Sequence, residues 1–380
     1  MGTKVAIVEV AQLAGPDSKD NFYDQAFRVT KEILDKAGLS RHELGTIVSA
    51  SSDVFHGGIS CANAYYWEAV GSFLKAGTRQ DGESLFALYY AAMKIMTGHF
   101  DTVLAIGLCK GSENPANDSI TQFIADPFYQ RPLGLNETVA AALQMRLYMD
   151  AYGITPEECA MVSVQNLRNA LRNPHAHRKG SFTVEEVISS PLTVEPLTDL
   201  MCGPKSEGFV AVLLASEEKA KQMTAKPVWI KGYGCSLDTF NLGDRDLLNG
   251  QLSTAARQAY ARAGVTDPRK EIDLVELTEP YGFQELLWLE DLGFCDRGMG
   301  ARLFDSGITA TNGDLPVNAS GGTLATNPYV SRGLARVVEC VLQIRGEAGE
   351  HQVDREVKTA LAHGCHGLAG QCHAVAVVGV

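Results

Sequence analysis

The most constraining feature of this sequence is that one order of strand, helix, turn and strand occurs twice. In the first half, an apolar strand pattern at 4–11 leads through a helix to KAGLSRHELGTIVSAS (36–51). In the second half, a strand pattern at 227–234 leads through a helix to RAGVTDPRKEIDLVELTE (262–279). Both helices end at Ala-Gly, and a charged turn then precedes a buried strand. A repeat of four elements in the same order indicates a duplication.

Strand patterns alternate with amphipathic helix patterns along the chain, which favours an α/β fold with substantially parallel sheets. Two halves, each too small to cover both faces of its own sheet, would pack as a five-layer α/β/α/β/α body. We expect these halves at residues 1–225 and 226–380. A helix-rich, more polar segment at about 111–190 interrupts the first half, after a strand at 102–109. Because α/β proteins build ligand sites at such strand ends, we expect an inserted loop domain that binds ligand.

Charge and composition argue against several classes of protein. The 380 residues carry a formal net charge of −12, whereas nucleic-acid surfaces need an excess of Lys and Arg. No run approaches the roughly 18 apolar residues of a membrane helix, and the N-terminus lacks a signal-peptide pattern. The nine cysteines are scattered and form no CxxC pair, which is typical of free thiols without a bound metal. We therefore expect a cytoplasmic protein with no metal and no nucleic-acid or membrane partner.

Five blocks occur in the order and spacing of a known enzyme family. They are NLRNALRNPHAH (166–177), PLTDLMCGPKSEGFVAVLLASEEKA (196–220), ELLWLEDLGFCDRG (285–298), VNASGG (317–322) and a block from GLARVVECVLQIRGEAGEHQV to TALAHG (333–364). In these blocks the chain resembles the thiolase superfamily, and most closely its sterol-carrier-protein-type and archaeal-type branch. The resemblance implies a thiolase-like fold and an enzyme acting on the carbon–carbon bond beta to a coenzyme A thioester. It also implies a homodimer formed through the first half and, as in several members, a small zinc-ribbon and OB-fold partner subunit.

The family's catalytic positions carry over unevenly to this chain. The family uses a nucleophilic cysteine at a helix N-terminus, where the helix dipole favours a thiolate. By the resemblance that position falls on Asp81, so the acyl-accepting thiol is missing. The loop that normally carries His-Asp holds Thr278 and Glu279, with Tyr281 close behind. The usual two-step acyl-enzyme route is therefore not expected.

Two further loops keep polar side chains at family positions. Asn327 stands where the family's GHP loop has its histidine, and an amide can donate a hydrogen bond to a thioester oxygen. The segment ALAHGCHGLAG (360–370) keeps a Gly-rich loop with His363, Cys365 and His366. By the resemblance, His363 is a base, since imidazoles move protons near neutral pH. Cys365 would supply a thiol from the opposite wall of the site.

Three of these residues have two interpretations each. Asp81 is either a helix cap, which suits an aspartate at a helix N-terminus, or a general base. Tyr281 and Tyr329 are either core aromatics or site residues. Superfamily branches that cleave β-hydroxyacyl-CoA by retro-aldol chemistry lack a working cysteine and rely on tyrosines near these loops. A tyrosine there would take the hydroxyl proton of the substrate.

Coenzyme A, as the substrate thioester, needs cations for its phosphates. The insertion supplies a cluster of basic side chains, which is alternatively a solvated helix face: Arg168, Arg172, Arg178 and Lys179, with His175 and His177. Gly321 and Gly322 resemble the family's turn where the pantetheine arm approaches the backbone, a closeness that glycine tolerates.

Three functions follow from the sequence. The first is a thiolase-like acyltransferase without a covalent cysteine intermediate, with Asp81 or His363 as base. The second is a carbon–carbon lyase that cleaves β-hydroxyacyl-CoA by a retro-aldol reaction. The third is a non-catalytic, thiolase-like subunit that binds acyl-CoA or completes an assembly. The loss of three motif residues favours the third, whereas the retained Gly-rich loops and His363 favour an enzyme.

Overall fold

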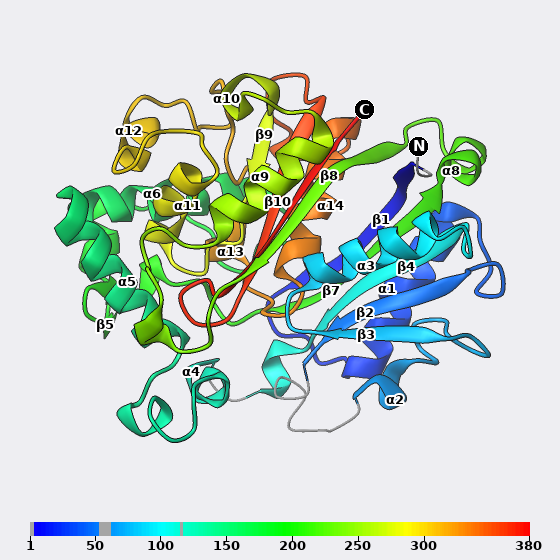
Figure 1. Cartoon of the computed structure of the whole chain (residues 1–380), viewed down its shortest axis with the longest axis horizontal. Helices are drawn as coiled ribbons and strands as arrows, with labels where there is room; N and C mark the ends of the chain where they lie inside the picture. Colours follow the sequence, from blue (N-terminus) through cyan, green and yellow to red (C-terminus); the bar gives the residue numbers. More distant parts are fainter. Residues whose placement is uncertain (1–3, 53–61, 115–116) are drawn as a thin grey trace.

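The computed structural model describes residues 4–52, 62–114 and 117–380 (Figure 1). Its strands are β1 (Val5–Gly15), β2 (Thr46–Ser51), β3 (Gly77–Asp81), β4 (Thr102–Cys109), β5 (Leu192–Val194), β6 (Leu197–Thr198), β7 (Glu207–Ser216), β8 (Val228–Leu237), β9 (Leu274–Glu276), β10 (Thr359–His366) and β11 (Cys372–Gly379). Its α-helices are α1 (Phe22–Ala37), α2 (Ala62–Tyr66), α3 (Ser84–Met96), α4 (Asn117–Thr121), α5 (Glu137–Tyr152), α6 (Pro156–Asn169), α7 (Val184–Ile188), α8 (Glu217–Met223), α9 (Leu252–Ala263), α10 (Pro268–Glu271), α11 (Gly282–Asp291), α12 (Gly300–Asp305), α13 (Gly322–Ala325) and α14 (Arg332–Arg345).

The main sheet repeats one topology in both halves. Its nine strands within the described residues run in the order β3-β2-β4-β7-β1-β8-β11-β10-β9. In the first half β2 is parallel to β4, while β7 is antiparallel to both β4 and β1. In the second half β9 is parallel to β10, while β11 is antiparallel to both β10 and β8. The predicted duplication is therefore confirmed, and the proposed division at residue 225 falls between α8 and β8.

The two Ala-Gly helix ends of the repeat have the same local structure. Helix α1 ends at Gly38 with a φ of 65°, and α9 ends at Gly264 with a φ of 76°. Both glycines are in the left-handed region, which favours a residue without a Cβ atom. The repeated sequence signal thus marks the same turn in each half.

Three hydrophobic cores separate the five expected layers. The central core packs α3 and α14, which contact each other, between the two halves of the sheet. A second core places α1 and α8 against the other face of the first half, and a third places α9 and α11 against the second half. Figure 1 shows α3 and α14 in the middle of the molecule, between these outer helices. The predicted five-layer α/β/α/β/α fold is confirmed.

The insertion connects β4 to β7 and carries α4, α5, α6, α7 and the small β5–β6 pair. Figure 1 shows α5, α6 and β5 beside α11 and α12 of the second half, and α6 contacts both of those helices. The insertion therefore packs against the second half although it belongs to the first half of the sequence. No helix in the described parts of the chain is long and apolar enough to cross a membrane.

The entrance of α3 differs from the sequence expectation. Asp81 is the last residue of β3, an edge strand with the polar sequence GTRQD that hydrophobic patterning did not reveal. The N-cap of α3 is Glu83, whose side chain accepts a hydrogen bond from the backbone N–H of Leu85. The interpretation of Asp81 as the helix cap is therefore wrong.

Candidate active site

A cavity of about 540 Å³ lies where the insertion meets the loops of the second half. Its wall includes side chains from the start of α5, from the segment 177–205, and from the loops at 280–281 and 327. Two of the predicted catalytic residues, Tyr281 and Asn327, are part of this wall. The loops that precede α11 and α14 place them there, so residues distant in sequence meet at one site.

Tyr281 begins a short chain of hydrogen bonds. Its hydroxyl lies 2.7 Å from Oγ1 of Thr138, which in turn donates to Oδ1 of Asp118 at 2.6 Å. Because a threonine hydroxyl has a single proton and gives it to the carboxylate, Thr138 accepts from Tyr281. Burial, with the nearby Glu137 carboxylate, raises the pKa of Tyr281 well above its ordinary value, so the phenol is neutral. The arrangement connects a cavity hydroxyl to a carboxylate that can take a proton.

Asn327 is held by a buried arginine. Nε of Arg332 donates to Oδ1 of Asn327 at 2.5 Å, and Nη1 of Arg332 donates to Oε1 of Glu137 at 3.1 Å. Since Oδ1 faces the guanidinium, Nδ2 is turned the other way, where it makes a long 3.4 Å contact with the carbonyl of Gly203. Asn327 therefore offers a weakly engaged N–H donor in the cavity wall.

Tyr329 and Cys365 lie near the cavity but are not part of its wall. The guanidinium of Arg332 lies 4.2 Å from the ring centre of Tyr329, and the ring of His366 meets Tyr329 edge-on at 5.6 Å. Sγ of Cys365 is 3.5 Å from the carbonyl of Thr278. Burial raises the pKa of Cys365 well above its ordinary value, so its thiol is protonated.

Glu279 is a fully buried carboxyl behind the Gly-Gly turn. Its Oε1 accepts from the backbone N–H of Leu324 at 3.1 Å and from Nδ2 of Asn166 at 3.3 Å. Burial raises its pKa to about 8, although the charge of Arg336 opposes the shift. A Cβ atom on Gly322 would lie 2.0 Å from Oε1 of Glu279. The missing side chain of Gly322 therefore makes room for this carboxyl.

Gly321 is used in the same way against the insertion. Its φ is 96°, and a Cβ atom there would lie 2.7 Å from the Cβ of Ala170 and 2.8 Å from that of Ala325. Close packing of the turn against α6 and its extension therefore requires glycine at this position. The contact of this turn with a pantetheine arm stays a prediction.

His363 is not part of the cavity wall and contacts α11. Its Nε2 lies 3.0 Å from Nδ1 of His373, and its ring meets the ring of Trp288 at 5.0 Å. Burial lowers the pKa of His363 well below its ordinary value, so the ring is neutral. The structure thus does not bring His363 to Tyr281 and Asn327.

Two carboxyls near the start of α3 have opposite environments. The side chain of Asp81 is 72% exposed and pairs with Arg79 at 3.1 Å. Glu83 is 1% exposed, and its Oε1 accepts from the backbone N–H groups of Leu85 at 3.0 Å and Gly333 at 2.8 Å. Burial raises the pKa of Glu83 to about 7. The carboxyl that receives the N-termini of both α3 and α14 is thus Glu83.

The predicted basic cluster is divided among three hollows. Arg178 is part of the 540 Å³ cavity wall and pairs with Asp199 at 3.2 Å. Arg168 and Arg172 border a hollow of about 200 Å³, and Lys179 borders another of about 530 Å³ that also includes Arg172. The four basic residues are therefore not gathered in one cavity.

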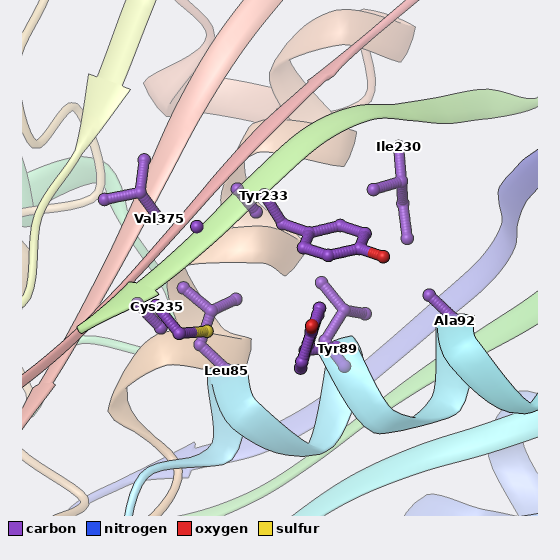
Figure 2. A pocket seen from close by; sticks show the side chains of 11 residues that line it. Leu85, Tyr89, Ala92, Ile230, Tyr233, Cys235 and Val375 are labelled. Atoms are coloured by element: carbon purple, nitrogen blue, oxygen red, sulfur yellow. The ribbon is translucent and has the colours of Figure 1, made fainter. Parts of the chain in front are cut away.

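A further hollow lies between α3, β8 and β11 and is lined mainly by apolar side chains (Figure 2). Tyr89 and Tyr233 point towards each other across it, and their ring centres are 4.4 Å apart. Its volume is about 10 Å³, so it is a small packing gap. Within the described residues, no group of three or more His, Cys, Asp or Glu side chains is arranged to hold a metal ion.

Sequence reasoning missed the residues that organise the cavity. Arg332 and Glu137 are 195 positions apart, and both are buried. Thr138 and Asp118 were also unmarked. The pattern LNETV (135–139) does predict the start of α5, but no sequence signal pairs Glu137 with Arg332. The residues that sequence reasoning did place in this wall are Tyr281, Asn327 and Arg178, with His177.

The duplicated five-layer fold with an inserted segment is the architecture that the resemblance implied. The family described as "Thiolase C-terminal domain-like" matches residues 234–380. The chain is 32% identical to an acetyl-CoA acetyltransferase from Methanothermobacter thermautotrophicus, over 96% of this chain and 97% of that protein. The chain belongs to the thiolase superfamily.

Two further comparisons extend this result. The chain is 28% identical to the benzoylsuccinyl-CoA thiolase subunit BbsB from Thauera aromatica, over 73% of this chain and 72% of that protein. A solved structure described as "Ltp2-ChsH2(DUF35) aldolase" matches with a TM-score of 0.85 and 23% identity, over 99% of this chain and 98% of that chain. At that identity the structural likeness shows the fold alone.

Proposed function

We propose that this protein is an acyl-CoA enzyme of the thiolase type that breaks or makes the carbon–carbon bond beta to a thioester by retro-aldol chemistry, without a covalent cysteine intermediate. The observation that supports this reaction is the chain from Tyr281 through Thr138 to Asp118, which starts at the cavity wall. Retro-aldol cleavage requires removal of a proton from a β-hydroxyl group, and this chain can accept one.

The β-hydroxyl gives its proton to the Tyr281 oxygen as the phenol proton moves to Thr138 and the Thr138 proton moves to Asp118. The bond between the α and β carbons breaks, the β carbon becomes an aldehyde or ketone, and the electron pair forms the enolate of the shorter acyl-CoA. That enolate then takes up a proton. No oxidant or reductant is consumed.

Asn327 would stabilise the enolate. The developing negative charge lies on the thioester oxygen, and Nδ2 of Asn327 is the amide donor turned away from Arg332. A preorganised donor at such an oxygen is worth roughly 3 kcal/mol of transition-state stabilisation. Arg332 and Glu137 would keep the amide in this orientation, because a flipped amide would turn its NH₂ towards a cation.

A thiolytic acyltransfer is the second candidate, supported by the relatives named as an acetyltransferase and a thiolase subunit. In this reaction free coenzyme A would attack a bound β-ketoacyl thioester directly. The two bases expected from the sequence, Asp81 and His363, are not part of the cavity wall, which favours the retro-aldol reaction. The state of the nearby thiols argues against an acyl-enzyme, since burial raises the pKa of the cavity residue Cys202 to about 12. Glu279 and Tyr329 remain candidate site residues in both reactions.

We also propose two assemblies. A homodimer through the first half would use the edge strand β3, whose outer backbone groups can pair with another strand. A small partner subunit with a zinc ribbon and an OB fold would complete the enzyme. Two of the similar proteins support the search for a partner. One is named as a thiolase subunit, and the other is a solved structure whose description joins two names, "Ltp2-ChsH2(DUF35) aldolase".

The decisive experiment supplies substrates for both reactions. The protein, with and without its co-encoded small partner, is incubated with a β-hydroxyacyl-CoA alone and with a β-ketoacyl-CoA plus coenzyme A. The retro-aldol proposal expects a carbonyl compound and a shorter acyl-CoA from the first ester. Two acyl-CoA products from the second ester would instead establish thiolysis, and no turnover of either would leave the non-catalytic subunit.

Two variants test the assignment of the base. Tyr281→Phe removes the phenol but keeps the ring, and we expect a fall in kcat of roughly 10²- to 10⁴-fold. Asp81→Asn should leave retro-aldol turnover unchanged, because Asp81 is outside the cavity wall. A loss of activity in Asp81→Asn with full activity in Tyr281→Phe would contradict the proposed proton path.

A further inference from the structure

Lys205 lies in the cavity wall directly beside Asn327. The two residues form an isolated parallel bridge, and the N–H of the next residue, Ser206, donates to the carbonyl of Asn327 at 3.3 Å. Lys205 is partly buried and belongs to the same 540 Å³ cavity as Tyr281. Its ammonium group is therefore within a side chain's length of the proposed thioester site.

The charged side chains Glu137, Asp199, Arg178 and Asp118 of the wall have partners within the protein. Glu137 pairs with Arg332 at 3.1 Å, and Asp199 pairs with Arg178 at 3.2 Å. Asp118 accepts the hydroxyl proton of Thr138. These bonds occupy the cavity's carboxylates with groups of the protein itself.

Lys205 differs from them in having no carboxylate partner. Its Nζ donates to the backbone carbonyl of Asn114 at 2.9 Å, and within the described residues no carboxylate oxygen lies within 4 Å of it. An ammonium group has three N–H donors, and only one of them has a partner among the residues that the structure describes. A cation of this kind in a cavity wall can bind an anionic ligand group.

We propose that Lys205 forms a subsite for a carboxylate on the acyl group, so that the preferred substrates are acyl-CoA esters with a negatively charged acyl chain. This inference rests on the proposed function, which places the thioester at Asn327. The phosphates of coenzyme A share the same anionic chemistry, but the pantetheine arm separates them from the thioester by far more than a lysine side chain can reach. The anion nearest Asn327 is therefore on the acyl side.

The test compares two esters of equal chain length. The first, 3-hydroxyadipyl-CoA, has a terminal carboxylate, and the second, 3-hydroxyhexanoyl-CoA, ends in a methyl group. The wild-type protein should favour the first in kcat/KM. In Lys205→Met that preference should fall by about 10- to 100-fold, as expected for the loss of one charge-assisted hydrogen bond.

Three further variants separate charge from structure. Lys205→Arg keeps the cation and should keep the preference, whereas Lys205→Gln keeps a donor without charge and should lose most of it. Lys75→Met is the matched control, because Nζ of Lys75 also donates to a backbone carbonyl, that of Arg41 at 2.7 Å, but lies outside the cavity. A loss that is equal for both esters in Lys205→Met, or no change in their ratio, would overturn the proposal.

A binding measurement separates this inference from the proposed reaction. Calorimetric titration of both esters into Tyr281→Phe and into the double variant Tyr281→Phe, Lys205→Met reads the subsite without turnover. Weaker binding of the carboxylated ester alone in the double variant supports the subsite even if no ester is cleaved by the wild-type protein. Turnover of both esters with equal binding in the two variants would refute the subsite and leave the retro-aldol reaction standing.

Discussion

Replacing Glu83 by glutamine should change how the stability of the protein depends on pH. Glu83 is 1% exposed, and burial raises its pKa from 4.5 to about 7. In the unfolded chain this carboxyl loses its proton near its ordinary pKa, while the folded protein retains the proton up to about pH 7. The folded state therefore binds more protons in this window, and stability falls as the pH rises through it. The shift corresponds to about 3 kcal/mol.

The Glu83→Gln variant lacks this ionisation, because an amide stays neutral. The amide oxygen can still accept from the backbone N–H groups of Leu85 and Gly333, which now bind Oε1 of Glu83. The new NH₂ group would take the place of Oε2, which has no hydrogen-bond partner, and leaving it unpaired costs roughly 1–3 kcal/mol at every pH. The variant and the wild type differ in their free energy of unfolding, and the pH-dependent part of that difference thus comes from the ionisation of Glu83.

Urea unfolding at about pH 5 and about pH 8 measures this difference. Relative to the wild type, the variant should gain about 2.5 kcal/mol between the two pH values. Glu185→Gln, which changes an exposed glutamate, should show no such gain. An identical stability difference at both pH values for Glu83→Gln would refute the conclusion that Glu83 is held protonated by burial.

Three further outcomes test the site's construction. Arg332→Met leaves the carboxylate of Glu137 buried without its partner and should lower the free energy of unfolding by about 3–5 kcal/mol. Much of this loss should be regained when Glu137→Gln is added. Urea unfolding that shows no recovery in the double variant would contradict the buried pair. Gly322→Ala should destabilise the protein more than Gly307→Ala. Both glycines have positive φ, but a Cβ atom at Gly307 would have no atom within 4 Å. Equal melting temperatures of the two variants would argue against the contact of Gly322 with the buried carboxyl of Glu279. Cys365 should resist alkylation by iodoacetamide at about pH 8 until the protein unfolds, because the residue is 3% exposed and its thiol is protonated. Rapid labelling in the folded state, read by peptide mass spectrometry, would show a reactive thiol.

Local sequence patterns determined most of the architecture. The strand and helix patterns of the repeat predicted the helices that became α1 and α9, and β4 was predicted with the boundaries that it has. The two Ala-Gly helix ends revealed the duplication because a helix that stops at a left-handed residue selects glycine wherever it occurs. Family resemblance also indicated the loops with Tyr281 and Asn327, since loop sequence and loop position repeat together in related chains.

Only the tertiary structure decided how these loops are used. Side chains alternate between the two faces of a strand, so the sequence of β10 places His363 and Cys365 on the same face. Only the packing of α11 against that face determines that His363 contacts Trp288. Likewise, the sequence placed two carboxyls at the entrance of α3, and the approach of α14 determined that Glu83 is buried while Asp81 stays exposed.

The cavity's charge pairs depend on tertiary structure for the same physical reason. Arg332 and Glu137 come from different halves of the chain, and each acquires its environment only when the insertion packs against the second half. Burial and the distance to an opposite charge set the chemistry of an ionisable group, and both are properties of the folded chain. The sequence by itself therefore determined the fold and the family, whereas the folded structure determined which of its polar residues share a cavity.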